Sequence, residues 1–114
     1  MSADCIFCKI VAGQIPANKV YEDDLVLAFH DIQPQAPVHV LVIPKKHLAS
    51  VNDLHADDSA MLSHLFTAVQ QVAKAAGIAE TGYRTVTNTG KNAGQVVPHL
   101  HFHVMGGKQL GHLG

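Results

Sequence analysis

Segment 97–105 of this 114-residue chain alternates histidine with apolar residues and reads Val-Pro-His-Leu-His-Phe-His-Val-Met. Successive side chains of a β-strand point to opposite faces, so this period of two predicts a strand over 97–105. His99, His101 and His103 would then share one face, and the apolar residues between them the other. Because three imidazoles are an unusual filling for a solvent-facing surface, we interpret the histidine face as a chemical site.

Apolar periodicity also predicts the other elements of the fold. Segment 57–76 has apolar residues at the 3.6-residue period of an amphipathic helix and ends before Gly77. Strand and helix do not alternate regularly, which favours an α+β fold with a mainly antiparallel sheet of about five strands. The chain length indicates one domain over residues 1–114. Shorter patterns predict a helix over 5–12, strands over 19–22, 25–30, 38–43 and 83–87, and a polar loop over 88–95.

Charge and hydropathy argue against two classes of partner. The chain has 8 Lys and Arg against 9 Asp and Glu, so no strong field attracts nucleic acid or an anionic membrane. Its longest apolar run, 40–43, is too short to span a bilayer, and residues 1–5 lack the basic and apolar parts of a signal peptide. We therefore expect a cytoplasmic protein that binds neither nucleic acid nor a membrane.

The C-x-x-C pair Cys5 and Cys8 indicates a metal or redox site, because a lasting disulfide is not expected in a reducing cytosol. The pair does not follow a strand of a βαβ unit, which argues against a thioredoxin-like role. The alternative is that Cys8 is a small buried residue of a helix and that Cys5 frays at the terminus. A metal held by all three histidines of 99–103 also stays open, although positions i and i+4 of a strand lie roughly 13 Å apart.

Several motifs outside the histidine run contribute to a family pattern together with it. They are Ile6-Phe7, 29–32 (Phe-His-Asp-Ile), 34–37 (Pro-Gln-Ala-Pro), His39, 43–47 (Ile-Pro-Lys-Lys-His), Gly94-Gln95 and Gly106-Gly107. In these motifs and in 99–105 the chain resembles the histidine triad (HIT) family, and within it the Hint-type branch of nucleoside-phosphoramidate hydrolases, over nearly its whole length. The resemblance implies the HIT-like fold, with a mainly antiparallel sheet, one long helix and a short N-terminal helix.

The resemblance implies covalent catalysis on purine (adenosine) 5′-monophosphate conjugates. His101 would attack the α-phosphorus to give a nucleotidyl-histidine, which water then hydrolyses. The backbone carbonyl of His99 would hold the other ring nitrogen of His101. His103 and His39 are the candidates for protonating the leaving amine, and Asn88 is the candidate for contacting the phosphate.

The resemblance also implies a nucleoside site made of one carboxylate and an apolar wall. Asp31 can accept hydrogen bonds from both ribose hydroxyls. Gln95 belongs to the polar loop that is expected to place amide donors near the phosphate. The residues expected to enclose the base or shape its pocket are Ile6, Phe7, Ile10, Phe29, His30 and Ile32.

For the cysteine pair, the resemblance implies a structural zinc site that the chemistry itself does not require. The expected ligands are Cys5, Cys8, His47 and His99. The other two histidines of the run would then remain available for catalysis.

Two departures from the family pattern limit what the resemblance implies. Val96 stands where close eukaryotic relatives have a phosphate-contacting serine, and the ending 111–114 lacks their longer, tryptophan-bearing tail. The resemblance therefore leaves the identity of the leaving group open. The resemblance further implies a homodimer joined through the long helix and an adjacent strand. A nucleotide-binding regulatory module with little catalysis is the alternative function.

Overall fold

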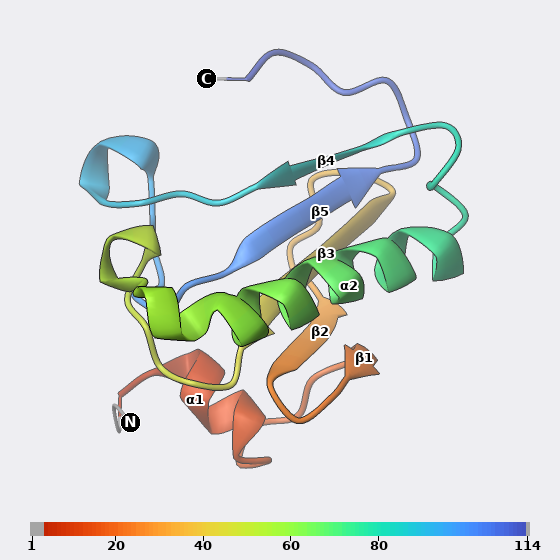
Figure 1. The fold of residues 1–114 in the computed structure, drawn as a ribbon. Helices are drawn as coiled ribbons and strands as arrows, with labels where there is room; N and C mark the ends of the chain where they lie inside the picture. Colours follow the sequence, from red (N-terminus) through yellow and green to blue (C-terminus); the bar gives the residue numbers. More distant parts are fainter. Residues whose placement is uncertain (1–3, 114) are drawn as a thin grey trace.

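The computed structural model describes residues 4–113 and contains an antiparallel sheet of five strands in the order β1-β2-β3-β5-β4 (Figure 1). The predicted α+β fold is confirmed, and each predicted strand except the last matches within one residue. Residues 1–3 and 114, and with them most of the segment interpreted as lacking a signal peptide, lie outside the described residues. The strands are β1 (Lys19–Glu22), β2 (Val26–His30), β3 (Val38–Pro44), β4 (Tyr83–Val86) and β5 (Phe102–Gly106).

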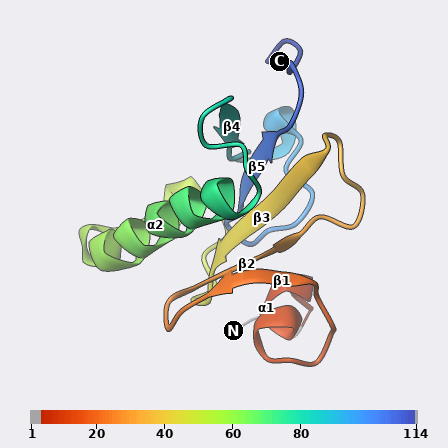
Figure 2. The same cartoon turned by 90° about the vertical axis from the view of Figure 1, so that its right-hand side faces the viewer.

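Helix α2 (Ser59–Ala75) covers one face of the sheet (Figures 1 and 2). It begins after a 3-10 turn (Ala56–Asp58) and ends before Gly77, whose φ of 74° provides a left-handed stop. Within residues 4–113, no helix is long and apolar enough to cross a membrane. The core under α2 includes Leu65 and Val72 of the helix and alternate strand residues Val26, Ala28, Val40, Val42 and Val104.

Helix α1 (Ile6–Val11) packs against the opposite face of the central strands (Figure 2). The side chain of Cys5 caps this helix by accepting a hydrogen bond from the amide of Cys8 at 3.3 Å. Because β2 and β3 are buried on both faces, they consist of nearly continuous apolar residues rather than an alternating pattern. This second cluster contains Phe7, Cys8 and Ile10 of α1 and the strand residues Leu27, Phe29, Leu41 and Ile43.

Strand β5 begins at Phe102, later than the predicted residue 97. Pro98 has no amide hydrogen to donate to a neighbouring strand. The amide of Leu100 donates to the carbonyl of Leu48, at 2.6 Å, in the segment that follows β3. The chain therefore bends at residues 97–99 and enters the sheet only at Phe102.

The three histidines still lie on the side of the chain that faces α1, because the ring of Phe7 contacts both His99 and His101. His99 is on the bent segment and its side chain contacts the cysteines of α1, whereas the rings of His101 and His103 lie 5.1 Å apart, centre to centre. The apolar residues between the histidines lie on the opposite face, because Leu100 and Phe102 both enter the core under α2.

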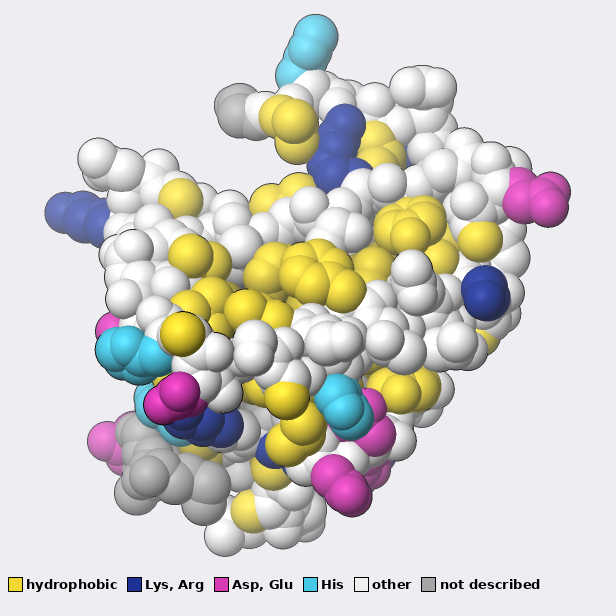
Figure 3. All heavy atoms as spheres, in the orientation of Figure 1, with side chains coloured by type: hydrophobic (Ala, Val, Ile, Leu, Met, Phe, Trp, Pro, Cys, Tyr) yellow, Lys and Arg dark blue, Asp and Glu magenta, His cyan; other side chains and the backbone are white. Residues whose placement is uncertain are grey.

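An exposed apolar surface lies over α2 and beside it. Figure 3, in the orientation of Figure 1, shows hydrophobic side chains gathered across this face. Phe66 of α2 is 48% exposed and contacts the ring of Phe102, while Tyr83 lies in β4, an edge strand of the sheet. Such a surface is suited to burial against another protein. The homodimer stays a prediction.

Gly106, at the end of β5, has no room for a side chain. A Cβ atom there would lie 2.9 Å from Cδ1 of Ile78 and 3.1 Å from the carbonyl oxygen of Gly82. We expect Gly106→Ala to lower the free energy of unfolding by about 1–3 kcal/mol, because the neighbours must shift. Gly111→Ala, whose Cβ would meet nothing within 4 Å, should change it by less than about 0.5 kcal/mol. Urea unfolding measures both values, and equal stabilities would contradict the steric argument.

Candidate active site and metal centre

A pocket of about 680 Å³ lies between α1, the ends of β2 and β5, and the loop that follows β4. Most residues predicted for catalysis or nucleotide binding line it, although they come from distant parts of the sequence. Gln95 and His99 are not among the lining residues. Those that line it are Ile6, Phe7, Ile10, Phe29, His30, Asp31, Ile32, His39, Asn88, His101 and His103.

His101 is 7% exposed and lines the pocket beside the rings of Phe7 and His103. Its Nδ1 donates a hydrogen bond to the carbonyl oxygen of His99 at 2.7 Å. A carbonyl oxygen can only accept, so Nδ1 carries the hydrogen and Nε2 of the neutral ring carries the lone pair. Nε2 is therefore the ring atom of His101 that is available to act as a nucleophile.

Asp31, His39 and His103 form a second polar group in the same pocket. Nε2 of His39 lies 2.9 Å from Nδ1 of His103 and 3.4 Å from Oδ2 of Asp31. Burial lowers the pKa of His103 to about 4, and the charges of His101 and His39 act in the same direction while Asp31 opposes them. Burial also lowers the pKa of His39 against the attraction of Asp31. Both imidazoles are therefore neutral near neutral pH.

The loop after β4 brings Asn88 to the pocket, but it uses Gln95 differently from the prediction. The Gln95 amide nitrogen donates to the carbonyls of Ala49 at 2.7 Å and Val97 at 3.0 Å. Its amide oxygen accepts from the backbone amide of Gly90 at 2.9 Å. Gln95 thus ties the loop to its surroundings, and its side chain is occupied by backbone groups rather than directed into the pocket.

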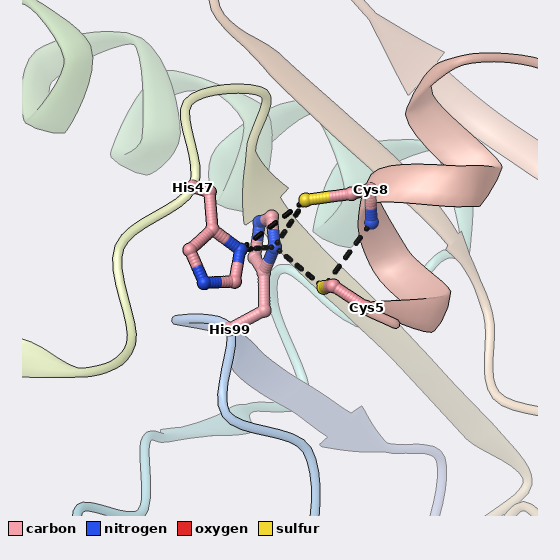
Figure 4. A group of neighbouring side chains, drawn as sticks. All are labelled: Cys5, Cys8, His47 and His99. Carbon is pink, nitrogen blue, oxygen red and sulfur yellow. Dashed lines mark hydrogen bonds between the residues drawn. The ribbon is translucent and has the colours of Figure 1, made fainter. Parts of the chain in front are cut away.

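The second site is a cluster of two thiols and two imidazoles, which converge from α1, the segment after β3 and the segment before β5 (Figure 4). Nδ1 of His99 lies 3.2 Å from Sγ of Cys5, 3.6 Å from Sγ of Cys8 and 3.2 Å from Nδ1 of His47. Sγ of Cys8 lies 3.2 Å from Nδ1 of His47. The cysteines are not joined by a disulfide, and the four side chains together could hold a metal ion.

The hydrogen bonding of His99 tests whether this cluster fits a metal. Its Nε2 donates to the carbonyl oxygen of Pro44 at 2.9 Å, so the lone pair of the neutral ring lies on Nδ1, facing the cluster. His99 is completely buried, and this burial lowers its pKa, which opposes protonation of Nδ1. A second ring nitrogen held by a backbone carbonyl is the usual support of a metal-ligating histidine. The donor set therefore fits a metal ion.

The pocket and the cluster are connected through His99 and Phe7. His99 directs its side chain into the cluster and offers its carbonyl to His101. Phe7 of α1 lies between Cys5, the N-cap of the helix, and Cys8, and its ring packs edge-on against His99 and His101 at centroid distances of 5.8 and 5.2 Å. A change in the cluster would therefore act directly on the residues that hold the ring of His101.

Sequence patterns do not reveal several groups that build these sites. The backbone carbonyl of Pro44 and the backbone amide of Gln35 each bond a histidine ring, and backbone groups have no residue-type signal. Leu41 and Met105 line the pocket, yet in the sequence they belong to apolar strand patterns typical of a core. Thr87, whose hydroxyl donates to the carbonyl of His101 at 2.8 Å, also carries no distinguishing motif.

The lowered pKa of His103 predicts a pH dependence of stability. Between its ordinary pKa of 6.5 and its folded value of about 4, the unfolded chain binds a proton that the folded chain does not. Acidification through this range should therefore lower the free energy of unfolding, and His103→Gln should lose less of it than wild type. Urea unfolding at both ends of the range measures the difference, with His112→Gln, in the exposed C-terminal segment, as the control. Equal losses in wild type and His103→Gln would contradict the assignment.

Comparisons with known proteins agree with these motifs and this fold. The family model described as HIT domain matches residues 12–110. A purine nucleoside phosphoramidase from Escherichia coli K12 is 46% identical over 111 residues, which cover 97% of this chain and 93% of the relative. A HIT family hydrolase from Legionella pneumophila superposes with a TM-score of 0.90 at 50% identity, over 93% of this chain and 95% of its own. A histidine triad protein from Clostridium difficile superposes with a TM-score of 0.94 at 46% identity, over 100% and 99% of the two chains. The chain therefore belongs to the HIT domain family.

Proposed function

We propose that this protein is a hydrolase that cleaves purine nucleoside 5′-phosphoramidates at the α-phosphorus through a nucleotidyl intermediate on His101. One observation carries the proposal: the hydrogen bond from Nδ1 of His101 to the carbonyl of His99 leaves the lone pair on Nε2, at the wall of a pocket. The activity for which the Escherichia coli relative is named supports the choice of substrate.

The dimensions and lining of the pocket support a nucleoside as part of the substrate. Its volume of about 680 Å³ falls within the range of about 300–1,000 Å³ typical of small-molecule sites. At the apolar end, Phe7 and Phe29 pack edge to face with their ring centres 5.6 Å apart, next to Ile10. Asp31 offers a carboxylate to the ribose hydroxyls, with Oδ1 steadied by the backbone amide of Gln33 at 2.8 Å.

The proposed reaction has two displacements at one phosphorus. In the first, Nε2 of His101 bonds to phosphorus while the bond to the leaving nitrogen breaks, and the departing amine takes the electron pair of that bond and a proton from solvent. In the second, water attacks phosphorus and releases a proton to solvent, the imidazole of His101 leaves with the electron pair of its bond to phosphorus, and the nucleoside monophosphate forms. The ring of His103, next to that of His101, can donate a hydrogen bond to the reacting group as negative charge develops.

Replacing the nucleophile tests the proposal. With adenosine 5′-phosphoramidate, we expect His101→Ala to lower kcat on the order of 10⁴-fold or more and to form no adenylated protein, because no other ring nitrogen replaces Nε2. AMP should still bind, since Asp31 and the apolar wall remain, and His103→Ala should lose less activity. AMP release is followed together with intact-mass spectrometry after a quench that avoids acid.

His64→Ala serves as the control, because His64 is an exposed residue of α2 that pairs with Asp23 and does not line the pocket. Turnover of His101→Ala at the wild-type rate would show that this residue is not the nucleophile. A wild-type protein that binds AMP without cleaving the phosphoramidate would instead be a nucleotide-binding module.

We further propose that the ion held by Cys5, Cys8, His47 and His99 is zinc. Zinc–nitrogen bonds of about 2.0 Å and zinc–sulfur bonds of about 2.3 Å, arranged tetrahedrally, place two nitrogens about 3.3 Å apart and a nitrogen and a sulfur about 3.5 Å apart. The corresponding distances here are 3.2 Å for the nitrogens and 3.2–3.6 Å for the mixed pairs. Zinc in this position would act structurally, by joining α1 to the segments that carry the two histidines.

Metal analysis tests this assignment. Protein purified from zinc-replete cells should contain about one zinc per chain, as expected for one four-ligand site. The double variant Cys5→Ala, Cys8→Ala should lose the metal, because two imidazoles alone hold zinc far more weakly. His112→Ala, in the exposed C-terminal segment, should keep it. Full zinc occupancy in the double variant would show that the cysteines are not ligands.

A further inference from the structure

Both ring nitrogens of His39 have partners, and His39 is only 4% exposed. Its Nδ1 accepts a hydrogen bond from the backbone amide of Gln35 at 3.0 Å. Its Nε2 lies 2.9 Å from Nδ1 of His103. The burial of His39 and the two contacts fix its ring in one orientation.

The contact with Gln35 determines where the hydrogens lie. A backbone amide can only donate, so Nδ1 of His39 carries the lone pair and Nε2 of the neutral ring carries the hydrogen. That hydrogen is directed at Nδ1 of His103, which must then accept. In the neutral ring of His103, the hydrogen is therefore on Nε2, and Nε2 has no hydrogen-bond partner among residues 4–113.

Asp31 also favours the tautomer of His39 that carries its hydrogen on Nε2. Its Oδ2 lies 3.4 Å from Nε2 of His39, and a nearby carboxylate favours a hydrogen on that nitrogen. Asp31, His39 and His103 also lie close enough together to suggest a metal site. A nitrogen that carries a hydrogen cannot coordinate a metal, so the amide of Gln35 makes this a hydrogen-bonded group instead.

We propose that His39 is a positioning residue, which holds His103 in the tautomer that presents Nε2–H to the pocket. This inference rests on the proposed function, because it assigns the hydrogen of His103 to an oxygen of the phosphoryl group attacked by His101. It also gives different roles to His39 and His103, which the sequence alone left as equal candidates for the general acid. His39 does not contact the substrate, and it acts through His103 by supplying one oriented hydrogen bond as negative charge develops.

Two substitutions of His39 separate positioning from mere packing. His39→Gln places an amide N–H₂ near the position of Nε2 and keeps a donor for His103, whereas His39→Leu removes the donor. We expect His103 to remain in the Nε2–H tautomer in wild type and His39→Gln, and to become a mixture of tautomers in His39→Leu. With adenosine 5′-phosphoramidate, kcat should fall on the order of 10²-fold in His39→Leu and less than about 10-fold in His39→Gln, with KM changed little.

The tautomer is measured without substrate, from the nitrogen-15 shifts of the His103 ring in long-range proton–nitrogen spectra near neutral pH, and kinetics are measured separately. His64→Gln is the control, since it makes the same chemical change at an exposed histidine outside the pocket. Unchanged His103 shifts in folded His39→Leu would overturn the inference. If His39→Leu does not fold, a folded His39→Gln with a 10²-fold loss of kcat would also overturn it.

The two proposals fail differently in this design. A tautomer change in His39→Leu, in a protein that does not cleave the phosphoramidate, would support positioning by His39 and reject the proposed function. Cleavage by wild type with an unchanged His103 tautomer in His39→Leu would reject positioning and leave the proposed function standing.

Discussion

The hydrogen bond from Nδ1 of His101 to the carbonyl of His99 is the constraint on which the rest of the site depends. It is 2.7 Å long and lies between two buried residues, so water does not compete for either group. It forms because the chain bends after Pro98 before it enters β5 at Phe102. The same bend sends the ring of His99 toward α1 and the ring of His101 into the pocket, which divides one histidine run between two sites.

A single backbone contact gives His99 and His39 opposite tautomers, and these two histidines belong to different clusters of similar composition. The carbonyl of Pro44 takes the Nε2 hydrogen of His99 and leaves a lone pair facing the cysteines, as a metal requires. The amide of Gln35 donates to Nδ1 of His39 and leaves a hydrogen facing His103, which excludes a metal. A histidine can therefore serve either as a metal ligand or as a hydrogen-bond donor, and its backbone partner determines which of the two roles it takes.

Burial supplies the remaining conditions for both sites. The central strands β2 and β3 are covered on both faces, by α2 on one and α1 on the other, so the histidines beside them lose contact with water. This lowers the pKa of His39, His99 and His103 and keeps their rings neutral, which both a metal ligand and an oriented hydrogen-bond donor need. Phe7 of α1 connects the two sites, because its ring contacts both His99 and His101.

Sequence patterns and motifs were enough to predict the α+β class, the strands other than β5 nearly to the residue, the family, and the chemical types of residue gathered in both sites. Periodicity reports which faces are buried, and burial of a strand or helix face is a local property of the pattern. The start of β5, the hydrogen bonds that Gln95 makes to its own loop, and the ring tautomers became known only from the tertiary structure. Each of these depends on a partner that the local pattern cannot specify: Leu48 for the amide of Leu100, Ala49 for Gln95, and the carbonyl of Pro44 for the ring of His99. Backbone donors and acceptors are the same in every residue, so their pairing is fixed only when folding brings distant segments together.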